Sequence, residues 1–84
     1  MRQTLLVRLY GAAGCHLCER ARETVLAARD ELGFELEEVA IDGDAELEAR
    51  YRELIPVVEI DGERAFVYFV PPDALRRKLA QTQS

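Results

Sequence analysis

Cys15-His16-Leu17-Cys18 is the stretch that decides the fold, because of what precedes and follows it in the chain. An apolar run over Leu5–Tyr10 and a small-residue turn, Gly11–Gly14, come before it, and a segment with helical periodicity comes after it. Two cysteines three residues apart at the N-terminus of a helix lie within one turn, so their sulfurs can meet and bond. The helix dipole and the free backbone N–H groups there favour a thiolate, the reactive form of cysteine. These are the only two cysteines of the chain, and the motif predicts a redox-active dithiol.

The residues from Cys15 to Leu32 predict an amphipathic helix, with apolar side chains on one face and charged side chains opposite. The apolar face consists of Leu17, Ala21, Val25, Ala28 and Leu32. Gly33 predicts the end of this helix, because glycine readily adopts the left-handed conformation that closes many helices. The apolar run before the motif, over residues 4–10, predicts a short and largely buried strand.

The middle of the chain predicts a second strand and a second helix. Residues 34–41 alternate in the manner of a strand, although the pattern is mixed. Asp42-Gly43-Asp44 then turns the chain and supplies a cap for a helix. Within that helix Leu47, Tyr51 and Leu54 share one face. A strand, a helix and a second strand in this order require a parallel pair of strands.

The last part of the chain predicts a hairpin and a third helix. Residues 55–60 and 64–70 flank Asp61-Gly62, which is the strongest short hairpin signal. Pro71-Pro72-Asp73 begins the last helix, and residues 81–84 form a polar tail. The apolar residues of this helix are Leu75 and Leu79.

The order β-α-β-α-β-β-α predicts an α/β fold with a four-stranded mixed sheet and three helices. The helices are expected to cover both faces of the sheet. A small metal-transfer domain with a cysteine pair after its first strand has the order βαββαβ and ends on a strand, whereas this chain ends on a helix. Its 84 residues predict one domain over 1–84. No repeat, linker or low-complexity segment divides them.

Composition excludes several classes of function. The net charge of −5 argues against nucleic acid as a partner, since phosphate binding requires a basic face. Arg8 interrupts the N-terminal apolar stretch well below the length of an export signal, and no stretch approaches the length of a membrane span. The chain is therefore expected in the cytoplasm, where a cysteine pair is more often catalytic or metal-binding than a structural disulfide.

The CxxC motif after a first strand, together with Ile55-Pro56 leading into the Val57–Ile60 strand and the Asp61-Gly62 turn, resembles the glutaredoxin branch of the thioredoxin superfamily. The likeness covers essentially the whole chain and implies a thioredoxin-like fold. It also implies that Cys15 is the exposed nucleophile and Cys18 the resolving thiol. Pro56 is implied to be cis and to face the cysteines, with the Ile55 backbone pairing to substrate.

The chain departs from that family at the glutathione site. Glutaredoxins usually carry a lysine three residues before the first cysteine, where this chain has Ala12. They also use a Gly-Gly turn before the last helix, where this chain has Val70-Pro71-Pro72, and proline has no N–H to offer an anion. Of the usual site, Ile55-Pro56 and Asp73 remain as candidate substrate-binding residues, and His16 inside the motif is a further candidate. Glutathione stays possible as a reductant, and no cofactor is expected.

Several residues have two readings. The cysteines predict redox catalysis, against metal binding or an inert pair, and a closed zinc site needs more ligands than two cysteines and one histidine supply. His16 either stabilises the Cys15 thiolate when protonated or is a neutral surface ring opposed by the helix dipole. The aromatic residues are expected to pack in the core and on the sheet rather than to form a substrate platform. They are Tyr10, Tyr51, Phe66, Tyr68 and Phe69.

Two hypotheses of function follow. The first is a cytoplasmic, monomeric thiol–disulfide oxidoreductase that acts on protein or small-molecule disulfides through Cys15 and Cys18, with glutathione or a thioredoxin-type reductase as electron donor. The second is a non-catalytic dithiol module that binds a soft metal or an iron–sulfur cluster between two chains, or that senses redox state.

Overall fold

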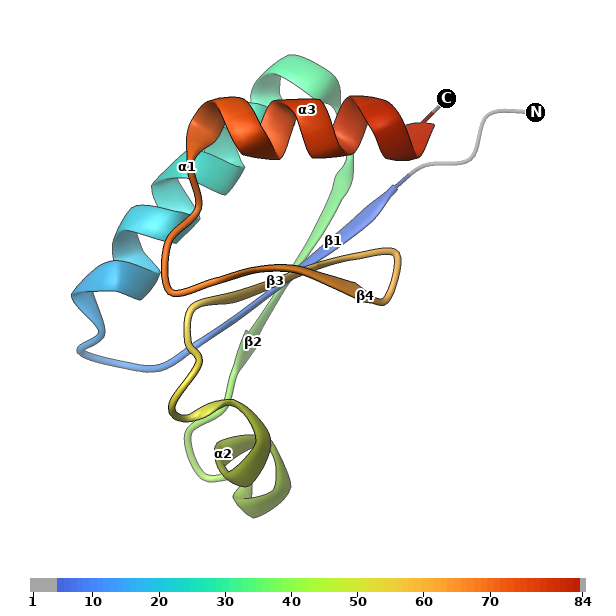
Figure 1. Ribbon diagram of the computed structural model, residues 1–84. Helices are drawn as coiled ribbons and strands as arrows, with labels where there is room; N and C mark the ends of the chain where they lie inside the picture. The colour runs from blue at the N-terminus through green and yellow to red at the C-terminus, as the bar shows by residue number, and fades with distance from the viewer. Residues whose placement is uncertain (1–4, 84) are drawn as a thin grey trace.

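Seven elements follow one another in the predicted order in a computed structural model that describes residues 5–83 (Figure 1). They are β1 (Leu6–Gly11), α1 (His16–Leu32), β2 (Glu35–Ala40), α2 (Ala45–Tyr51), β3 (Val57–Ile60), β4 (Glu63–Val67) and α3 (Pro72–Gln83). Residue 4, where the first strand was expected to begin, lies outside the described residues. Gly33 ends α1 in the left-handed conformation, with φ of 71°, and its N–H donates to the Arg29 carbonyl at 2.8 Å. The glycine cap expected from the sequence is therefore confirmed.

The four strands form one mixed sheet in the order β2-β1-β3-β4. β1 and β2 are parallel, with Val7 opposite Leu36. β3 runs antiparallel to β1, with Leu9 opposite Val58, and β4 runs antiparallel to β3. Asp61 and Gly62 have φ of 51° and 86° and join β3 to β4 as the predicted hairpin turn. The predicted mixed sheet with three helices is confirmed.

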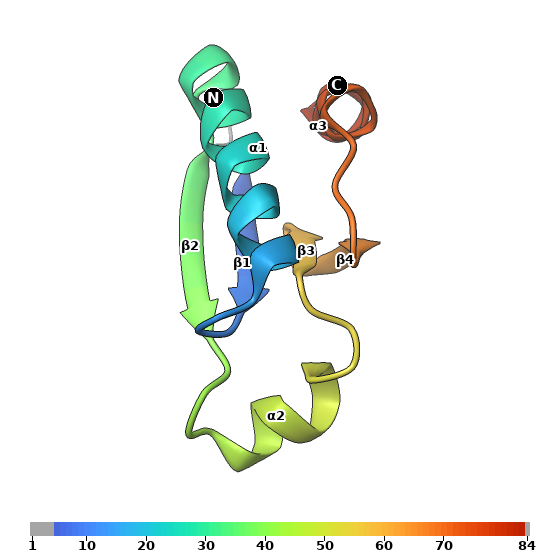
Figure 2. The same cartoon turned by 90° about the vertical axis from the view of Figure 1, so that its left-hand side faces the viewer.

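The main core lies between the sheet and the pair α1 and α3, which cover the same face (Figure 2). Val7 and Leu9 of β1 point into it, and the intervening side chains point to the other face because strand side chains alternate. An ion pair between Arg76 of α3 and Glu31 of α1, at 2.7 Å, links the two helices. The buried residues of this core are Leu5, Val7, Leu9, Ala21, Val25, Ala28, Phe34, Val58, Ile60, Val70, Leu75 and Leu79.

A smaller cluster holds α2 against the opposite side of the sheet. Its buried members are Tyr10, Ile41, Tyr51 and Val57. The rings of Tyr10 and Tyr51 stack with their centroids 4.3 Å apart. α2 lies at one end of the sheet, beside the turn that leads into α1 (Figure 2). The cluster joins β1, the segment after β2, α2 and β3.

The apolar face of α1 is narrower than the sequence predicted. Ala21, Val25 and Ala28 are buried, but Leu17 and Leu32 are 47% and 41% exposed. α1 is 17 residues long, so its two ends extend past the core that its middle turns cover. In the first turn Cys18, rather than Leu17, points inward and is 8% exposed.

The second hairpin strand is shorter than predicted. It ends at Val67, not Val70, because Tyr68 leaves the extended conformation with φ of 66°. Tyr68 and Phe69, expected to pack on the sheet, are 48% and 61% exposed. The first hairpin strand likewise begins later than predicted, at Val57, after Ile55 and Pro56, which are joined by a cis peptide bond.

The expected polar tail is also wrong over residues 81–83. α3 continues to Gln83, and the hydroxyl of Thr82 donates to the Lys78 carbonyl at 2.8 Å within it. Polar side chains do not stop a helix whose apolar face is already packed, here through Leu75 and Leu79. Residue 84 lies outside the described residues.

Candidate active site

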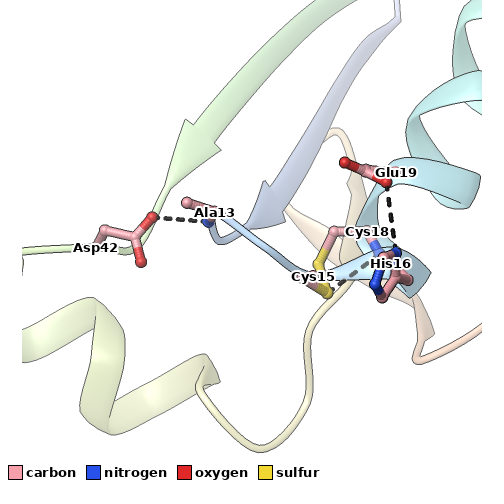
Figure 3. Close-up of a disulfide and its surroundings, with 6 residues drawn as sticks. All are labelled: Ala13, Cys15, His16, Cys18, Glu19 and Asp42. Carbon is pink, nitrogen blue, oxygen red and sulfur yellow. Dashed lines mark hydrogen bonds and ion pairs between the residues drawn. A yellow bond between two sulfur atoms is a disulfide. The ribbon is translucent and has the colours of Figure 1, made fainter.

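The cysteine pair lies where the turn after β1 becomes the first turn of α1. Cys15 is the N-cap residue and has extended backbone dihedrals, and Cys18 lies one turn inside the helix. The two residues form a disulfide with their Cα atoms 5.2 Å apart, within the usual range for such bonds (Figure 3). The predicted position of the dithiol at a helix N-terminus is confirmed.

The two sulfurs differ in environment. Cys18 is buried, whereas Cys15 is partly exposed. The Sγ of Cys15 accepts a hydrogen bond from the Cys18 backbone N–H at 3.1 Å, taking the place that a serine or aspartate oxygen usually occupies at an N-cap. A thiolate at Cys15 would keep this donor and the favourable end of the helix dipole. The arrangement distinguishes an accessible sulfur from a protected one.

Two features of the motif's surroundings restrict its movement. The backbone N–H of Ala13 donates to the Asp42 carboxylate at 2.9 Å, which ties the turn before Cys15 to the segment after β2 (Figure 3). A Cβ on Gly11 would lie 3.3 Å from the Cβ of Cys18 and 3.4 Å from its Sγ, so glycine allows the end of β1 to approach Cys18 closely. Neither Asp42 nor Gly11 was singled out from the sequence, because each read simply as a turn residue.

His16 lies directly beside the disulfide and points into solvent, with its side chain 95% exposed. Its Nδ1 is 3.8 Å from a carboxylate oxygen of Glu19, one turn along α1 (Figure 3). Both side chains of this contact are exposed. The contact therefore favours the interpretation of His16 as a surface ring over its interpretation as a partner of the Cys15 thiolate.

Ile55 and Pro56 lie in the connection between α2 and β3, which rises beside Cys15 in Figure 3. The cis bond between them agrees with what the resemblance implied. The Ile55 N–H donates to the Tyr51 carbonyl at 3.0 Å, so the expected pairing of the Ile55 backbone with substrate cannot use this donor. The Pro56 carbonyl accepts from the Tyr68 N–H at 2.9 Å, so the segment after β4 is fixed to this connection.

The remaining candidate, Asp73, lies in the first turn of α3. Its side chain is 92% exposed and contacts Arg76 at 3.7 Å. The structure therefore groups Cys15, His16 and Cys18 in one turn of α1 and places the Ile55-Pro56 connection beside them. Asp73 belongs to a separate element and is paired within it.

A carboxylate that the sequence analysis passed over holds α2 to the sheet behind the motif. Glu59 of β3 accepts hydrogen bonds from the hydroxyls of Tyr51 at 3.1 Å and Tyr10 at 3.4 Å, and its side chain is 12% exposed. Burial, and then the hydrogen bond to Glu59, raise the pKa of the Tyr51 hydroxyl above its ordinary value. Glu59 is the one charged residue inside the apolar run 55–60, and this position was the sequence signal that could have indicated the cluster.

A cavity of about 270 Å³ lies on the side of Cys18 that faces β2. Leu9, Cys18 and Val39 line its apolar part. An ion pair between Arg22 and Glu38, at 2.6 Å, lines its polar edge. Among residues 5–83, no group of three or more histidine, cysteine, aspartate or glutamate side chains is placed to hold a metal ion. No helix in the same range is long and apolar enough to cross a membrane.

The order of elements, the mixed sheet and a cysteine pair capping the first helix define a thioredoxin-like fold carrying a CxxC disulfide. The structure superposes on Fasciola hepatica thioredoxin with a TM-score of 0.69, at 22% identity over 95% of this chain and 82% of that one. It superposes on protein Ne2328 from Nitrosomonas europaea with a TM-score of 0.77, at 27% identity over all of this chain and 96% of that one.

Within that class the family is also defined. Residues 6–80 match the model of the glutaredoxin-like domain (DUF836), and the chain belongs to this family. An uncharacterized protein of Mycobacterium tuberculosis is 31% identical over 81 residues, which cover 90% of this chain and 84% of that protein. The resemblance drawn from the CxxC motif and Ile55-Pro56 is thereby confirmed.

Proposed function

We infer that this protein is a thiol–disulfide oxidoreductase in which Cys15 is the nucleophile and Cys18 the resolving thiol. The observation that carries the proposal is the asymmetry of the pair. Cys15 is partly exposed, and its sulfur caps α1 and accepts the Cys18 N–H, whereas Cys18 is buried one turn below it. A disulfide that serves only as a structural link has no need of an accessible sulfur aimed at a helix N-terminus.

The reaction proceeds by two exchanges. The Cys15 thiolate attacks one sulfur of a substrate disulfide, forms a mixed disulfide and releases the other sulfur as a thiolate that takes a proton from water. The Cys18 thiol gives its proton to water and attacks the Cys15 sulfur, which forms the Cys15–Cys18 disulfide and releases the second substrate sulfur as a thiolate that is protonated in turn. The substrate gains two electrons and two protons in all. The protein gives up two electrons, the Cys18 proton and the proton that Cys15 lost when its thiolate formed.

The substrates in this proposal are protein or small-molecule disulfides, with glutathione a poor ligand. The chain lacks a lysine at Ala12 and lacks backbone donors at Pro71 and Pro72. Arg50 and Arg52 of the second-helix region are the nearest replacements in sequence, but both have other contacts. The Arg50 guanidinium lies 5.2 Å from the centre of the Tyr51 ring, and Arg52 pairs with Glu48 at 3.6 Å.

The expected setting is the cytoplasm, with the protein as a monomer reduced by glutathione or by a thioredoxin-type reductase. The reduction potential of the Cys15–Cys18 couple, measured against glutathione and thioredoxin couples, tests the proposal. A midpoint between about −180 and −280 mV suits an exchanging dithiol. A midpoint well below about −300 mV is typical of a structural disulfide and would contradict the proposal.

The metal-binding alternative has its own test. Residues 5–83 hold no cluster of three or more potential ligands, and a site shared between two chains would take only the two cysteines of each. Freshly purified protein that is brown, or that carries metal in proportion to chain, would assign the cysteines to a metal or an iron–sulfur cluster instead. A colourless protein whose two thiols react freely after reduction supports the oxidoreductase.

A further inference from the structure

Most of the large apolar side chains that face solvent come from two segments, the cysteine motif and the connection between β4 and α3. Among residues 5–83 four such side chains are exposed: Leu17, Leu32, Tyr68 and Phe69. Leu17 lies between the two cysteines, and Tyr68 and Phe69 lie in the connection between β4 and α3. Leu32 ends α1 and lies at the far end of the same helix. Exposed apolar side chains that cluster, rather than scatter, mark a contact surface.

The backbone of the β4–α3 connection holds its two rings away from the core. Tyr68 has φ of 66°, a conformation that is unfavourable for a bulky residue with a Cβ. It is retained because the Tyr68 N–H donates to the Pro56 carbonyl at 2.9 Å and to the Leu54 carbonyl at 3.2 Å. The Phe69 N–H donates to the Val67 carbonyl at 2.7 Å, and the chain returns to the core at Val70, which is 3% exposed. The unfavourable backbone conformation of Tyr68 therefore occurs where Tyr68 and Phe69 turn outward.

This connection lies beside the cysteine motif. The hydrogen bond from the Tyr68 N–H to the Pro56 carbonyl, at 2.9 Å, fixes it to the connection that rises beside Cys15 in Figure 3. We call Leu17, Tyr68 and Phe69 the docking surface.

The size of the docking surface favours a brief encounter over a permanent complex. An aromatic side chain offers about 150–250 Å² in all, of which Tyr68 and Phe69 expose 48% and 61%. Even with Leu17 added, the apolar area falls well short of the roughly 800 Å² per partner of a stable interface, and redox encounters lie at the small end of the range. A second copy of this chain bound permanently is therefore disfavoured.

We propose that the docking surface binds the apolar side chains that flank the reactive cysteine of a protein disulfide substrate. The proposal rests on the oxidoreductase function and specifies its substrate class. A partner cannot use the Ile55 N–H, which is bonded to Tyr51, so side-chain contact with Tyr68 and Phe69 supplies selection that this donor does not. The reacting sulfur then meets Cys15 while the neighbouring apolar residue covers the rings.

In the test, each protein variant is assayed with each of two disulfide peptides. The peptides share one intramolecular disulfide and differ only in the residues that flank their cysteines, which are phenylalanine in one and serine in the other. The wild type is expected to reduce the phenylalanine peptide with kcat/KM about five- to tenfold higher, chiefly through KM. Phe69→Ser and Tyr68→Asn should bring that ratio close to one. Asparagine tolerates positive φ, so Tyr68→Asn removes the ring without adding backbone strain.

Leu32→Ser is the matched control, because it removes another exposed apolar side chain, at the far end of α1 from the motif. It is expected to keep the wild-type ratio, and Phe69→Leu should keep most of it. Wild type and Phe69→Ser, each assayed with both peptides, form a double-mutant cycle. Its coupling free energy measures the contact between Phe69 and the phenylalanine of the peptide. An unchanged preference in Phe69→Ser and Tyr68→Asn, or an equal loss in Leu32→Ser, would overturn the proposal. A stable dimer of the wild type that Phe69→Ser dissociates would overturn it too, by assigning the surface to a second copy.

Failure of the oxidoreductase function is distinguishable from failure of this inference. In the first case the reduced wild type reduces neither peptide. In the second it reduces both peptides, and the variants show the same ratio as the wild type.

Discussion

The backbone N–H of Cys18 donates a hydrogen bond to the Sγ of Cys15 over 3.1 Å. Cys15 thus caps the helix that contains Cys18, and a charge that develops on its sulfur meets a donor already in place. The Cys18 sulfur does not cap the helix in the same way, because Cys18 is inside the helix and buried. The geometry therefore predicts different reactivities for two cysteines of one motif.

Reactivity of the two thiols should separate in single-cysteine variants. In Cys18→Ser the alkylation rate of Cys15 is expected to reach half of its maximum clearly below the pH of about 8.5 at which an ordinary thiol does so. In Cys15→Ser the remaining Cys18 should react more slowly at every pH, since it is buried. Rates followed from pH 4 to pH 10 check both. Equal rates with an ordinary midpoint would contradict the assignment of roles.

The Asp42 carboxylate is expected to hold the turn before Cys15 through the Ala13 N–H, 2.9 Å away. Asp42→Ala removes the acceptor and should lower the free energy of unfolding by about 0.5–1.5 kcal/mol. Asp42→Asn keeps an oxygen in the same place and should lose less. Urea unfolding of the two variants makes the comparison. An asparagine variant as unstable as the alanine variant would show that the hydrogen bond is not what Asp42 contributes.

The Tyr51 hydroxyl should make the protein sensitive to alkaline pH. Its pKa is raised in the folded state above the ordinary value of 10.0, so the folded protein holds this proton more tightly than the unfolded chain. Its contribution to stability is then complete below about pH 10 and is lost as the pH rises through the folded pKa. Tyr51→Phe is expected to lower the free energy of unfolding by about 1.5–3 kcal/mol at neutral pH, because the hydrogen bond to Glu59 is lost. Above pH 10 this variant should lose less stability than the wild type, because it lacks the hydroxyl that ionises.

Tyr68→Phe is the control for Tyr51→Phe, since Tyr68 is 48% exposed. Urea unfolding between pH 7 and pH 11 provides the measurement. Tyr68→Phe should follow the wild-type curve throughout. A Tyr51→Phe variant that loses stability above pH 10 as steeply as the wild type would contradict the role given to this hydroxyl.

Removal of glutathione from a mixed disulfide should be a weak activity of Cys15 alone. A lysine in place of Ala12 would add one charge-assisted contact worth roughly 1.5–3 kcal/mol, and the two prolines withhold further donors. Together these differences predict binding of glutathione weaker by tens- to hundred-fold than in a site that has them. Cys18→Ser is expected to lose nearly all deglutathionylation, while the wild type still reduces a dithiol substrate. High activity in Cys18→Ser would reveal a competent glutathione site.

The fold could be predicted because its signals are local. The Asp61-Gly62 turn, the Gly33 cap and the strand before Cys15 each indicate one element through backbone conformation or side-chain period. The order of those elements then requires a parallel pair and a hairpin. These inferences need no knowledge of which side chains meet across the sheet.

Side-chain pattern alone could predict the site only where its residues adjoin in sequence, whereas Ile55-Pro56 was assigned to it through the family resemblance. Cys15, His16 and Cys18 come from one turn, whereas the bonds from Ala13 to Asp42 and from Tyr51 to Glu59 join segments that only the folded chain brings together. Tyr68 and Phe69 were misassigned because their apolar character matches a buried strand. The positive φ of Tyr68, which turns them outward, depends on a hydrogen bond to Pro56 in another element.

Trapping the covalent intermediate tests the central claim most directly. Reduced Cys18→Ser, mixed with a peptide disulfide, is predicted to stop at a mixed disulfide that mass spectrometry locates on Cys15. The wild type, treated in the same way, should carry no adduct at the end and should have lost two hydrogen atoms as Cys15–Cys18 closes. A peptide adduct that forms on Cys18 of Cys15→Ser as fast as on Cys15 of Cys18→Ser, or a wild type that leaves the peptide disulfide intact, would contradict the account.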